Sequence, residues 1–176
     1  MALRVGSKAP GFSLPGVDGE TYSLAGFAGK QAVVVILSCN HCPYVVMYED
    51  RMVQVQADYA ARGVQLIAIC ANDDVKYPAD SFEAMKQRAA EKGFNFPYVR
   101  DASQQVARAY GAAVTPEVFV VSAEGVIVYH GRLDDNAQDS SRVKTHDLRN
   151  ALDQLLAGEE VTVKDTEPVG CSIKWQ

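Results

Sequence analysis

The fold of this chain is decided by residues 36–44, which read ILSCNHCPY. The stretch places Cys39 and Cys42 directly after an apolar, β-branched run and directly before a segment with helical periodicity. At the N-terminus of a helix, unpaired backbone amides and the positive end of the helix dipole favour a thiolate, which is the reactive form of cysteine. Cys42 lies about one helical turn beyond Cys39, near enough to close a disulfide after the first sulfur has attacked. The pattern therefore predicts a dithiol redox pair on a strand–loop–helix unit.

Half of a zinc site has the same cysteine spacing, so a metal site and a pair of inert structural thiols are the alternatives. A zinc ribbon needs a second pair of cysteines, whereas Cys70 and Cys171 are isolated and the remaining histidines do not form a metal-type pair. The context of a strand followed by a helix favours redox chemistry. We expect no metal and no other cofactor.

Length and composition predict one domain with its own core. The chain has 176 residues, of which 48% are hydrophobic. A net charge of −5 and a pI near 5.2 argue against binding to nucleic acid or to an anionic membrane surface. The first residues contain no apolar signal-peptide core, and no apolar run reaches transmembrane length. We therefore expect a cytoplasmic protein, and in that compartment a Cys-x-x-Cys motif is more often catalytic than structural.

Hydrophobic periodicity predicts an α/β architecture, in the order βαβ, then a helix, then ββα. The result is a central mixed sheet with helices on both faces, preceded by an N-terminal extension with short edge structure. Residues 1–158 are predicted to form the domain, and residues 159–176 a C-terminal tail that packs on it through Ile173 and Trp175. The predicted strands span residues 31–38, 64–70, 98–100, 117–121 and 125–129, and the predicted helices span residues 43–61, 80–92, 104–110 and 145–157.

Thr115 and Pro116 come immediately before the fourth of these strands. A proline is tolerated at the start of a strand because it gives up no ladder hydrogen bond there. In this context we predict a cis peptide bond between Thr115 and Pro116.

Several motifs of the chain resemble the thioredoxin-like superfamily. They are the strand–Cys-x-x-Cys–helix unit, the Thr-Pro before a ββα ending, and Gly-x-x-Ala-Pro-x-Phe-x-Leu at residues 6–14. Residues 29–30, 101–111 and 122–125 extend the match to its redoxin branch, the alkyl hydroperoxide reductase/thiol-specific antioxidant proteins, over residues 5–157. The Cys-Asn-His-Cys-Pro core and the ending Gly-Cys-Ser-Ile-Lys-Trp resemble a subgroup known only as thioredoxin family proteins.

This resemblance implies a thioredoxin fold with Cys39 as the exposed nucleophile and Cys42 as its partner thiol. It also implies a cis Pro116 opposite the disulfide, where adjacent backbone binds the partner chain. Peroxiredoxins carry a Pro-x-x-x-Thr-x-x-Cys motif, and on this chain their attacking cysteine matches Cys42. However, Cys39 replaces their threonine, Val35 replaces their proline, and their distant arginine falls near Pro116. The chain as a whole therefore resembles a peroxiredoxin, while its cysteine site resembles that of a thiol–disulfide oxidoreductase.

The sequence also predicts roles around the pair. We expect Cys39 to have the lower pKa and Cys42 to resolve the mixed disulfide. A charged His41 would stabilise the thiolate and make the disulfide more oxidising, unless its side chain simply faces solvent. Cys70 ends a buried strand and is predicted to be inert. Cys171 is expected to pack with the tail, or else to act as an exposed third thiol.

Four aspartates are candidate proton acceptors for the cysteine pair. Asp73 and Asp74 follow the second long strand, and Asp134 and Asp135 follow the last strand. The alternative is that all four are solvated loop carboxylates, which is the usual state of aspartate.

These observations predict an enzyme, a thiol–disulfide oxidoreductase that acts in redox homeostasis. Its partners would be protein disulfides or small thiols, with a dithiol or thioredoxin-type electron donor. One alternative is a peroxiredoxin-like peroxidase that reduces hydroperoxides, and another is a metal-binding or chaperone module that uses Cys39, Cys42 and a histidine. The oligomeric state stays open.

Overall fold

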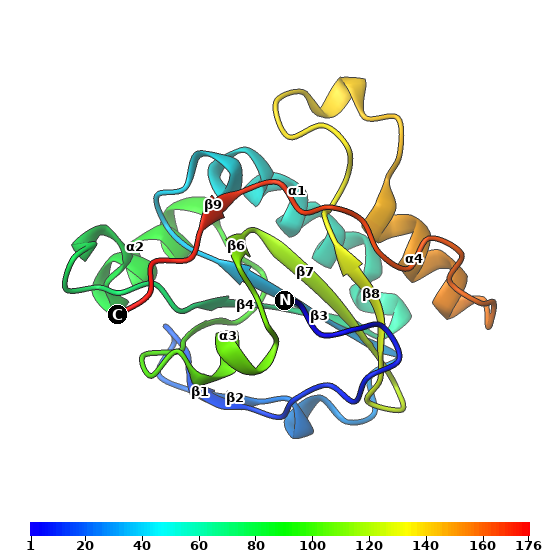
Figure 1. Ribbon diagram of the computed structural model, residues 1–176, viewed down its shortest axis with the longest axis horizontal. Coiled ribbons are helices and arrows are strands. Elements are labelled where there is room, and N and C mark those ends of the chain that lie inside the picture. Colours follow the sequence, from blue (N-terminus) through cyan, green and yellow to red (C-terminus); the bar gives the residue numbers. More distant parts are fainter.

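A five-stranded mixed sheet forms the centre of the molecule in the computed structural model, which describes residues 1–176 (Figure 1). The strand order is β5-β4-β3-β7-β8, with β3 and β4 parallel and β7 antiparallel to β3. Its strands are β3 (Ala32–Ser38), β4 (Val64–Cys70), β5 (Tyr98–Arg100), β7 (Glu117–Ser122) and β8 (Ile127–Gly131). The predicted mixed α/β sheet is confirmed.

The helices are α1 (Pro43–Tyr59), α2 (Phe82–Lys92), α3 (Gln105–Ala109) and α4 (Asp147–Leu156). Short 3₁₀ turns lie at Ala25–Phe27, Ala60–Arg62, Pro78–Asp80 and Ser140–Arg142. Two small sheets complete the fold: β1 (Ser13–Pro15) pairs with β2 (Thr21–Ser23), and β6 (Val114–Thr115) pairs with β9 (Cys171–Ser172). No helix has the length and apolar character needed to cross a membrane.

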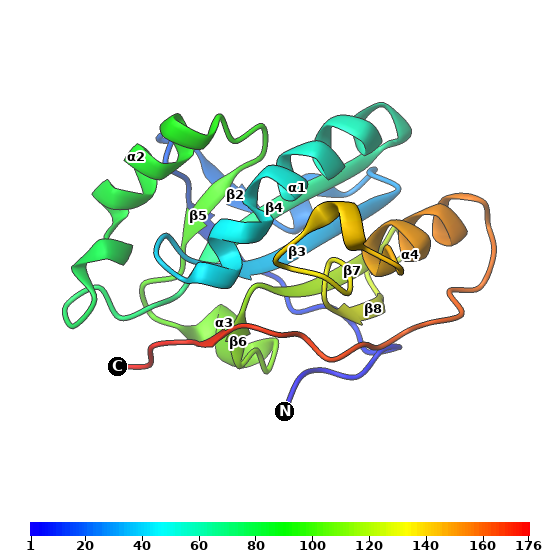
Figure 2. The ribbon, with the colours of Figure 1, turned by 90° about the horizontal axis from the view of Figure 1, so that it is seen from above.

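Strand β3 lies at the middle of the sheet and is buried along its whole length. Because side chains alternate across a strand, Val34 and Ile36 enter one apolar cluster, while Val35 and Leu37 enter another. The first cluster packs under α1, α2 and α4, and the second under α3 and the N-terminal extension (Figure 2). Two covered faces explain why β3 reads as a continuous apolar run.

The ends of two helices differ from the sequence prediction. Helix α2 begins at Phe82, since the Ser81 hydroxyl accepts a hydrogen bond from the Ala84 amide, so the start predicted at Asp80 is wrong. Helix α4 begins after His146 and has no side-chain cap, so the cap predicted at Thr145 is also wrong. The Thr145 hydroxyl instead donates to the Asp147 carboxylate at 3.3 Å.

The C-terminal tail runs back from α4 along β8 and then past β6 (Figures 1 and 2). It bonds to β8 near His130 and pairs with β6 through β9. Ile173 is buried in the second apolar cluster, and Trp175 packs against that cluster with Arg108 over its ring. The tail therefore covers the edge of the molecule where β6 lies.

Candidate active site

The cysteine pair lies where β3 gives way to α1. Ser38 is the last residue of β3, Cys42 is the N-cap of α1, and Pro43 occupies the first turn, where a missing amide leaves no hydrogen bond unmade. Cys39 is 2% exposed and Cys42 is 1% exposed. The expectation of an exposed Cys39 is therefore wrong, because other parts of the chain cover both sulfurs.

Thr115 is the residue that contacts both sulfurs. Its hydroxyl oxygen lies 3.5 Å from Cys39 Sγ, and its carbonyl oxygen lies 3.4 Å from Cys42 Sγ. The peptide bond from Thr115 to Pro116 is cis, as the sequence predicted. The fold thus brings residues 39, 42, 115 and 116 into one small site.

Asp80 and His41 form the polar side of this site. Asp80 is fully buried, and its Oδ2 lies 2.7 Å from His41 Nδ1. One ligand-type atom from each of Cys39, His41 and Asp80 lies within 4.8 Å of the other two. His41 is 36% exposed at its side chain and stacks on Tyr77. The alternative of a histidine that only faces solvent is therefore wrong.

Other donors already satisfy the Asp80 carboxylate. The backbone amide of Asn40 donates to Asp80 Oδ1 at 2.7 Å, and the side-chain amide of Asn72 donates to Asp80 Oδ2 at 2.9 Å. A metal held by Cys39, His41 and Asp80 would have to replace the His41–Asp80 hydrogen bond. These residues differ from the cysteine pair plus histidine that the metal alternative required.

Comparison with known proteins assigns the chain to a family. The family model described as Redoxin matches residues 4–152. The chain belongs to the Redoxin family. This redoxin is 28% identical, over 128 residues, to the thiol-disulfide oxidoreductase ResA of Geobacillus thermodenitrificans, an alignment that covers 72% of this chain and 68% of that protein.

Two solved structures match the whole redoxin. A hypothetical protein from Sinorhizobium meliloti is 37% identical, with a TM-score of 0.94 over 100% of this chain and 97% of the other. An uncharacterized conserved protein from Geobacillus kaustophilus is 40% identical, with a TM-score of 0.93 over 98% and 93% of the two chains. Because both matches extend beyond residue 152, the C-terminal tail is part of the shared structure.

Within the redoxin site, the two cysteines share a proton unequally. The hydrogen bond that Cys39 makes to Cys42, together with burial, raises the pKa of the Cys39 thiol. The same hydrogen bond lowers the pKa of Cys42, against the effect of burial, with help from the Cys171 thiol and the amides of Val45 and Cys171. The sequence predicts the lower pKa at Cys39, whereas the hydrogen-bond donors in the folded chain converge on Cys42, at the start of α1.

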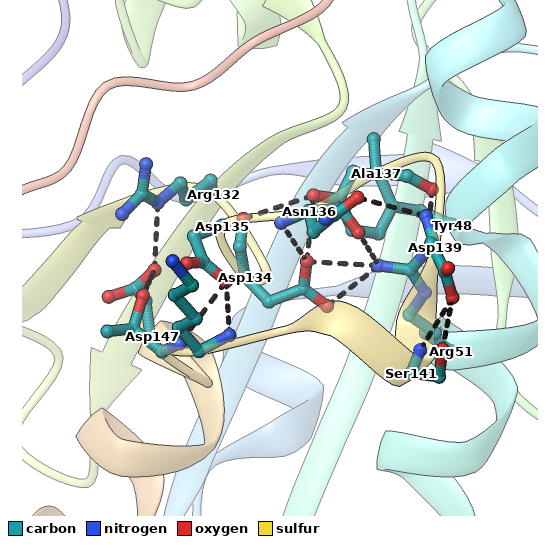
Figure 3. A network of polar contacts seen from close by, with 12 residues as sticks. Tyr48, Arg51, Arg132, Asp134, Asp135, Asn136, Ala137, Asp139, Ser141 and Asp147 are labelled. Carbon is teal, nitrogen blue, oxygen red and sulfur yellow. Dashed lines mark hydrogen bonds and ion pairs between the residues drawn. The ribbon is translucent and has the colours of Figure 1, made fainter.

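The four aspartates proposed as proton acceptors have structural roles. Figure 3 shows Asp134 bound to Arg51 and Tyr48, with Arg51 Nη1 2.8 Å from Asp134 Oδ2. Asp135 accepts the backbone amides of residues 144 and 145. Asp73 caps the turn that follows it, and Asp74 lies 3.5 Å from Arg100. Asp80, which the sequence predicts only as a helix start, is the carboxylate beside Cys39.

The other two cysteines occupy different settings. Cys70 is fully buried, and burial raises its pKa to about 11, in keeping with an inert thiol. Cys171 is half-buried in β9, opposite Thr115, and packs against the apolar cluster that contains Cys42. Cys171 thus packs with the tail, as predicted, but it packs against the cysteine pair.

Proposed function

We propose that this redoxin is a thiol–disulfide oxidoreductase whose Cys39–Cys42 pair alternates between a dithiol and a disulfide. The observation that carries the proposal is the contact of both sulfurs with Thr115 beside the cis Pro116. Two thiols that share a proton at the start of a helix supply a thiolate at neutral pH and a second sulfur within reach of it. The ResA relatives, named as thiol-disulfide oxidoreductases, support the same reaction class.

The reaction starts from the thiolate. Cys42 Sγ attacks one sulfur of the partner's disulfide, and the other partner sulfur leaves as a thiolate that takes up a proton. Cys39 then loses its proton and attacks Cys42 Sγ, which closes the Cys39–Cys42 disulfide and releases the partner's second thiolate. The partner gains two electrons and the pair loses two. A dithiol electron donor of the thioredoxin type reverses the sequence, and we propose the cytoplasm as its setting.

The remaining site residues tune or position this chemistry. A charged His41, next to Asp80 and Cys39, stabilises the anion of the reduced pair. Thr115 places a hydroxyl at Cys39 and a carbonyl at Cys42. Pro116 fixes the course of the backbone at that contact.

A redox equilibrium tests the proposal. The reduced protein is incubated with a series of glutathione redox buffers, and alkylation with mass spectrometry then maps each cysteine. We expect a two-electron transition with a Cys39–Cys42 disulfide, and a Cys42→Ser variant that neither forms it nor reduces a disulfide substrate. Cys70→Ala, which removes a buried thiol outside the pair, is the matched control. A wild-type pair that stays reduced throughout the series, or that never exchanges with glutathione, would show that the proposal is wrong.

A peroxidase is the second candidate, because the lowered pKa falls on Cys42, the position of the attacking cysteine of peroxiredoxins. In that reaction Cys42 takes the terminal oxygen of a hydroperoxide and releases an alcohol or water. Cys39 then condenses with the resulting sulfenic acid, which forms the disulfide and a water molecule. The proline, threonine and arginine of peroxiredoxins are replaced here by Val35, Cys39 and Pro116. We therefore favour thiol–disulfide exchange over peroxide reduction. A rate of reaction with hydrogen peroxide far above that of a free thiol would reverse this preference.

A further inference from the structure

The tail is fixed on both sides of the cysteine pair. Upstream, the His130 amide donates to the Lys164 carbonyl, and the Thr166 amide donates to the His130 carbonyl, each at 2.9 Å. Downstream, the Ile173 amide donates to the Ala113 carbonyl at 2.9 Å. Residues 167–172 therefore form a strap, anchored at each end, that crosses the site.

The middle of the strap is held much more loosely. Residues 167–170 make no hydrogen bond, and the side chain of Val169 is exposed. Local opening occurs most readily where few buried contacts and few hydrogen bonds must be broken. Between the two anchors, the two-residue pairing of β9 with β6 is therefore the contact that has to break for the strap to lift from the site.

The strap meets the site through its short strand. In β9, Cys171 lies opposite Thr115, the residue that contacts both sulfurs of the pair. A Cβ on Gly170 would collide with the Thr115 carbonyl group, so only glycine allows this approach. The Cys171 side chain packs against the apolar cluster that contains Cys39 and Cys42, and its thiol and amide help to lower the pKa of Cys42. Two other thiols, those of Cys39 and Cys171, therefore act on Cys42.

We propose that Cys171 is a third redox cysteine, which exchanges with the pair to form a Cys42–Cys171 disulfide. This inference rests on the proposed function, which supplies the Cys39–Cys42 disulfide. The Cys171 thiolate attacks Cys42 Sγ, the new bond between residues 42 and 171 forms, and the bond between residues 39 and 42 breaks. Cys39 leaves as a thiolate and gains the proton that Cys171 lost. One disulfide replaces another, so no external oxidant or reductant is needed.

The pairing of β9 with β6 gives the tail a second role in the same proposal. An edge strand offers unpaired backbone groups to any extended segment, and here the chain's own β9 occupies that edge. Cys171 thereby stands where a partner strand would present its cysteine to Cys42. A protein partner has to displace the strap, and an internal disulfide holds the strap closed.

A Cys39→Ser variant tests the new bond directly. This variant keeps Cys42 and Cys171, and it is oxidised with one equivalent of glutathione disulfide before non-reducing peptide mapping. Attack by Cys42 first gives a glutathione adduct, which Cys171 then resolves. We expect at least ten times more Cys42–Cys171 disulfide than Cys42 adduct. A Cys39→Ser/Cys171→Ser protein should instead accumulate the adduct.

Equal accumulation of the adduct in both proteins would overturn the inference. The wild-type protein, treated in the same way, separates this failure from failure of the proposed function. A wild type that forms the Cys39–Cys42 disulfide while the single variant only accumulates the adduct refutes the role of Cys171 alone. A wild type that forms neither the Cys39–Cys42 nor the Cys42–Cys171 disulfide refutes the proposed function.

A variant of the strap tests the docking itself. Gly170→Ala should push the strap from β6 and raise the alkylation rates of Cys42 and Cys171 at least fivefold in the reduced protein. Gly11→Ala is the matched control, because a Cβ there meets no atom within 4 Å. Circular dichroism confirms that both variants are folded. Alkylation of Gly170→Ala at the wild-type rate would show that β9 does not cover the pair.

Discussion

Replacement of His41 by alanine should make the reduction potential of the Cys39–Cys42 pair more negative. His41 lies beside Asp80 and within 4.8 Å of Cys39, so a charged imidazole offsets a buried carboxylate next to the anion of the reduced pair. Without the imidazole, the carboxylate acts on that anion unopposed. The reduced form then loses stability relative to the disulfide.

The magnitude follows from the distance and the exposure. The relevant separation is that of His41 from Cys39, within 4.8 Å. Two unit charges about 5 Å apart interact by about 3 kcal/mol at an effective dielectric constant of ~20, and by about 1 kcal/mol in a water-like medium. Because Cys42 carries the anion and Cys39 keeps the proton, both figures are upper bounds. Since the His41 side chain is 36% exposed, solvent screening makes the lower figure the appropriate one. For a two-electron couple, about 1 kcal/mol corresponds to about 20 mV.

The assay is an equilibrium of the protein with glutathione redox buffers at pH 6. A Cys171→Ser background in every protein leaves one disulfide to quantify by alkylation and mass spectrometry. His146→Ala, which removes an exposed histidine at the start of α4, is the control and should leave the potential unchanged. Asp80→Asn should move the potential in the opposite direction, because the Asp80 charge raises the pKa of Cys39. A potential unchanged in His41→Ala, or shifted to a less negative value, would refute the reasoning.

Three further predictions concern stability. Burial lowers the pKa of His130, but its hydrogen bonds to Glu117 and Asp165 outweigh burial and leave the pKa above 6.5. The stabilisation by His130 is thus present below pH 6.5 and is lost as the pH rises through the folded-state pKa. In urea unfolding, His130→Gln should therefore lower the free energy of unfolding, relative to wild type, by more at pH 5 than at pH 8. An equal deficit at both pH values would contradict this. Asp134→Ala breaks the ion pair of Figure 3 and should lower the free energy of unfolding by about 2–4 kcal/mol; a loss below ~0.5 kcal/mol would mean that the pair is solvent-screened. Ile36→Ala leaves a cavity in the first apolar cluster and should cost about 2–5 kcal/mol, measured by the same denaturation; a much smaller loss would mean that the core collapses around the site.

Local patterns were enough to predict the frame of the site. The apolar run of β3 and the proline at the start of α1 predicted a strand and a helix that meet at the cysteines. The Thr-Pro before β7 predicted the cis bond. Each of these features depends on a few consecutive residues and on rules of backbone geometry, so one sequence was sufficient.

The chemistry inside the site depends on contacts between distant residues. Asp80 reaches Cys39 only because the turn that carries it lies beside the start of α1, and its sequence neighbours suggested a helix cap instead. The shifts of the two cysteine pKa values run against the sequence prediction for a similar reason. The helix end acts on Cys42, as the dipole argument requires, but the donors that decide the order are the thiols of Cys39 and Cys171. Cys171 follows Cys42 by more than a hundred residues, and the residues around Cys171 do not predict its contact with the cysteine pair.

The coupling between the sulfurs has a consequence for the resolving step. While Cys42 is a thiolate, the hydrogen bond from Cys39 holds the proton on Cys39. Once Cys42 is bound in a mixed disulfide, its sulfur carries no charge, and the largest cause of the raised Cys39 pKa disappears. Burial and the Asp80 charge are the opposing effects that remain, and the charge of His41 offsets the second. Cys39 therefore becomes a competent nucleophile only after Cys42 has reacted, and this change in its pKa sets the order of the two attacks.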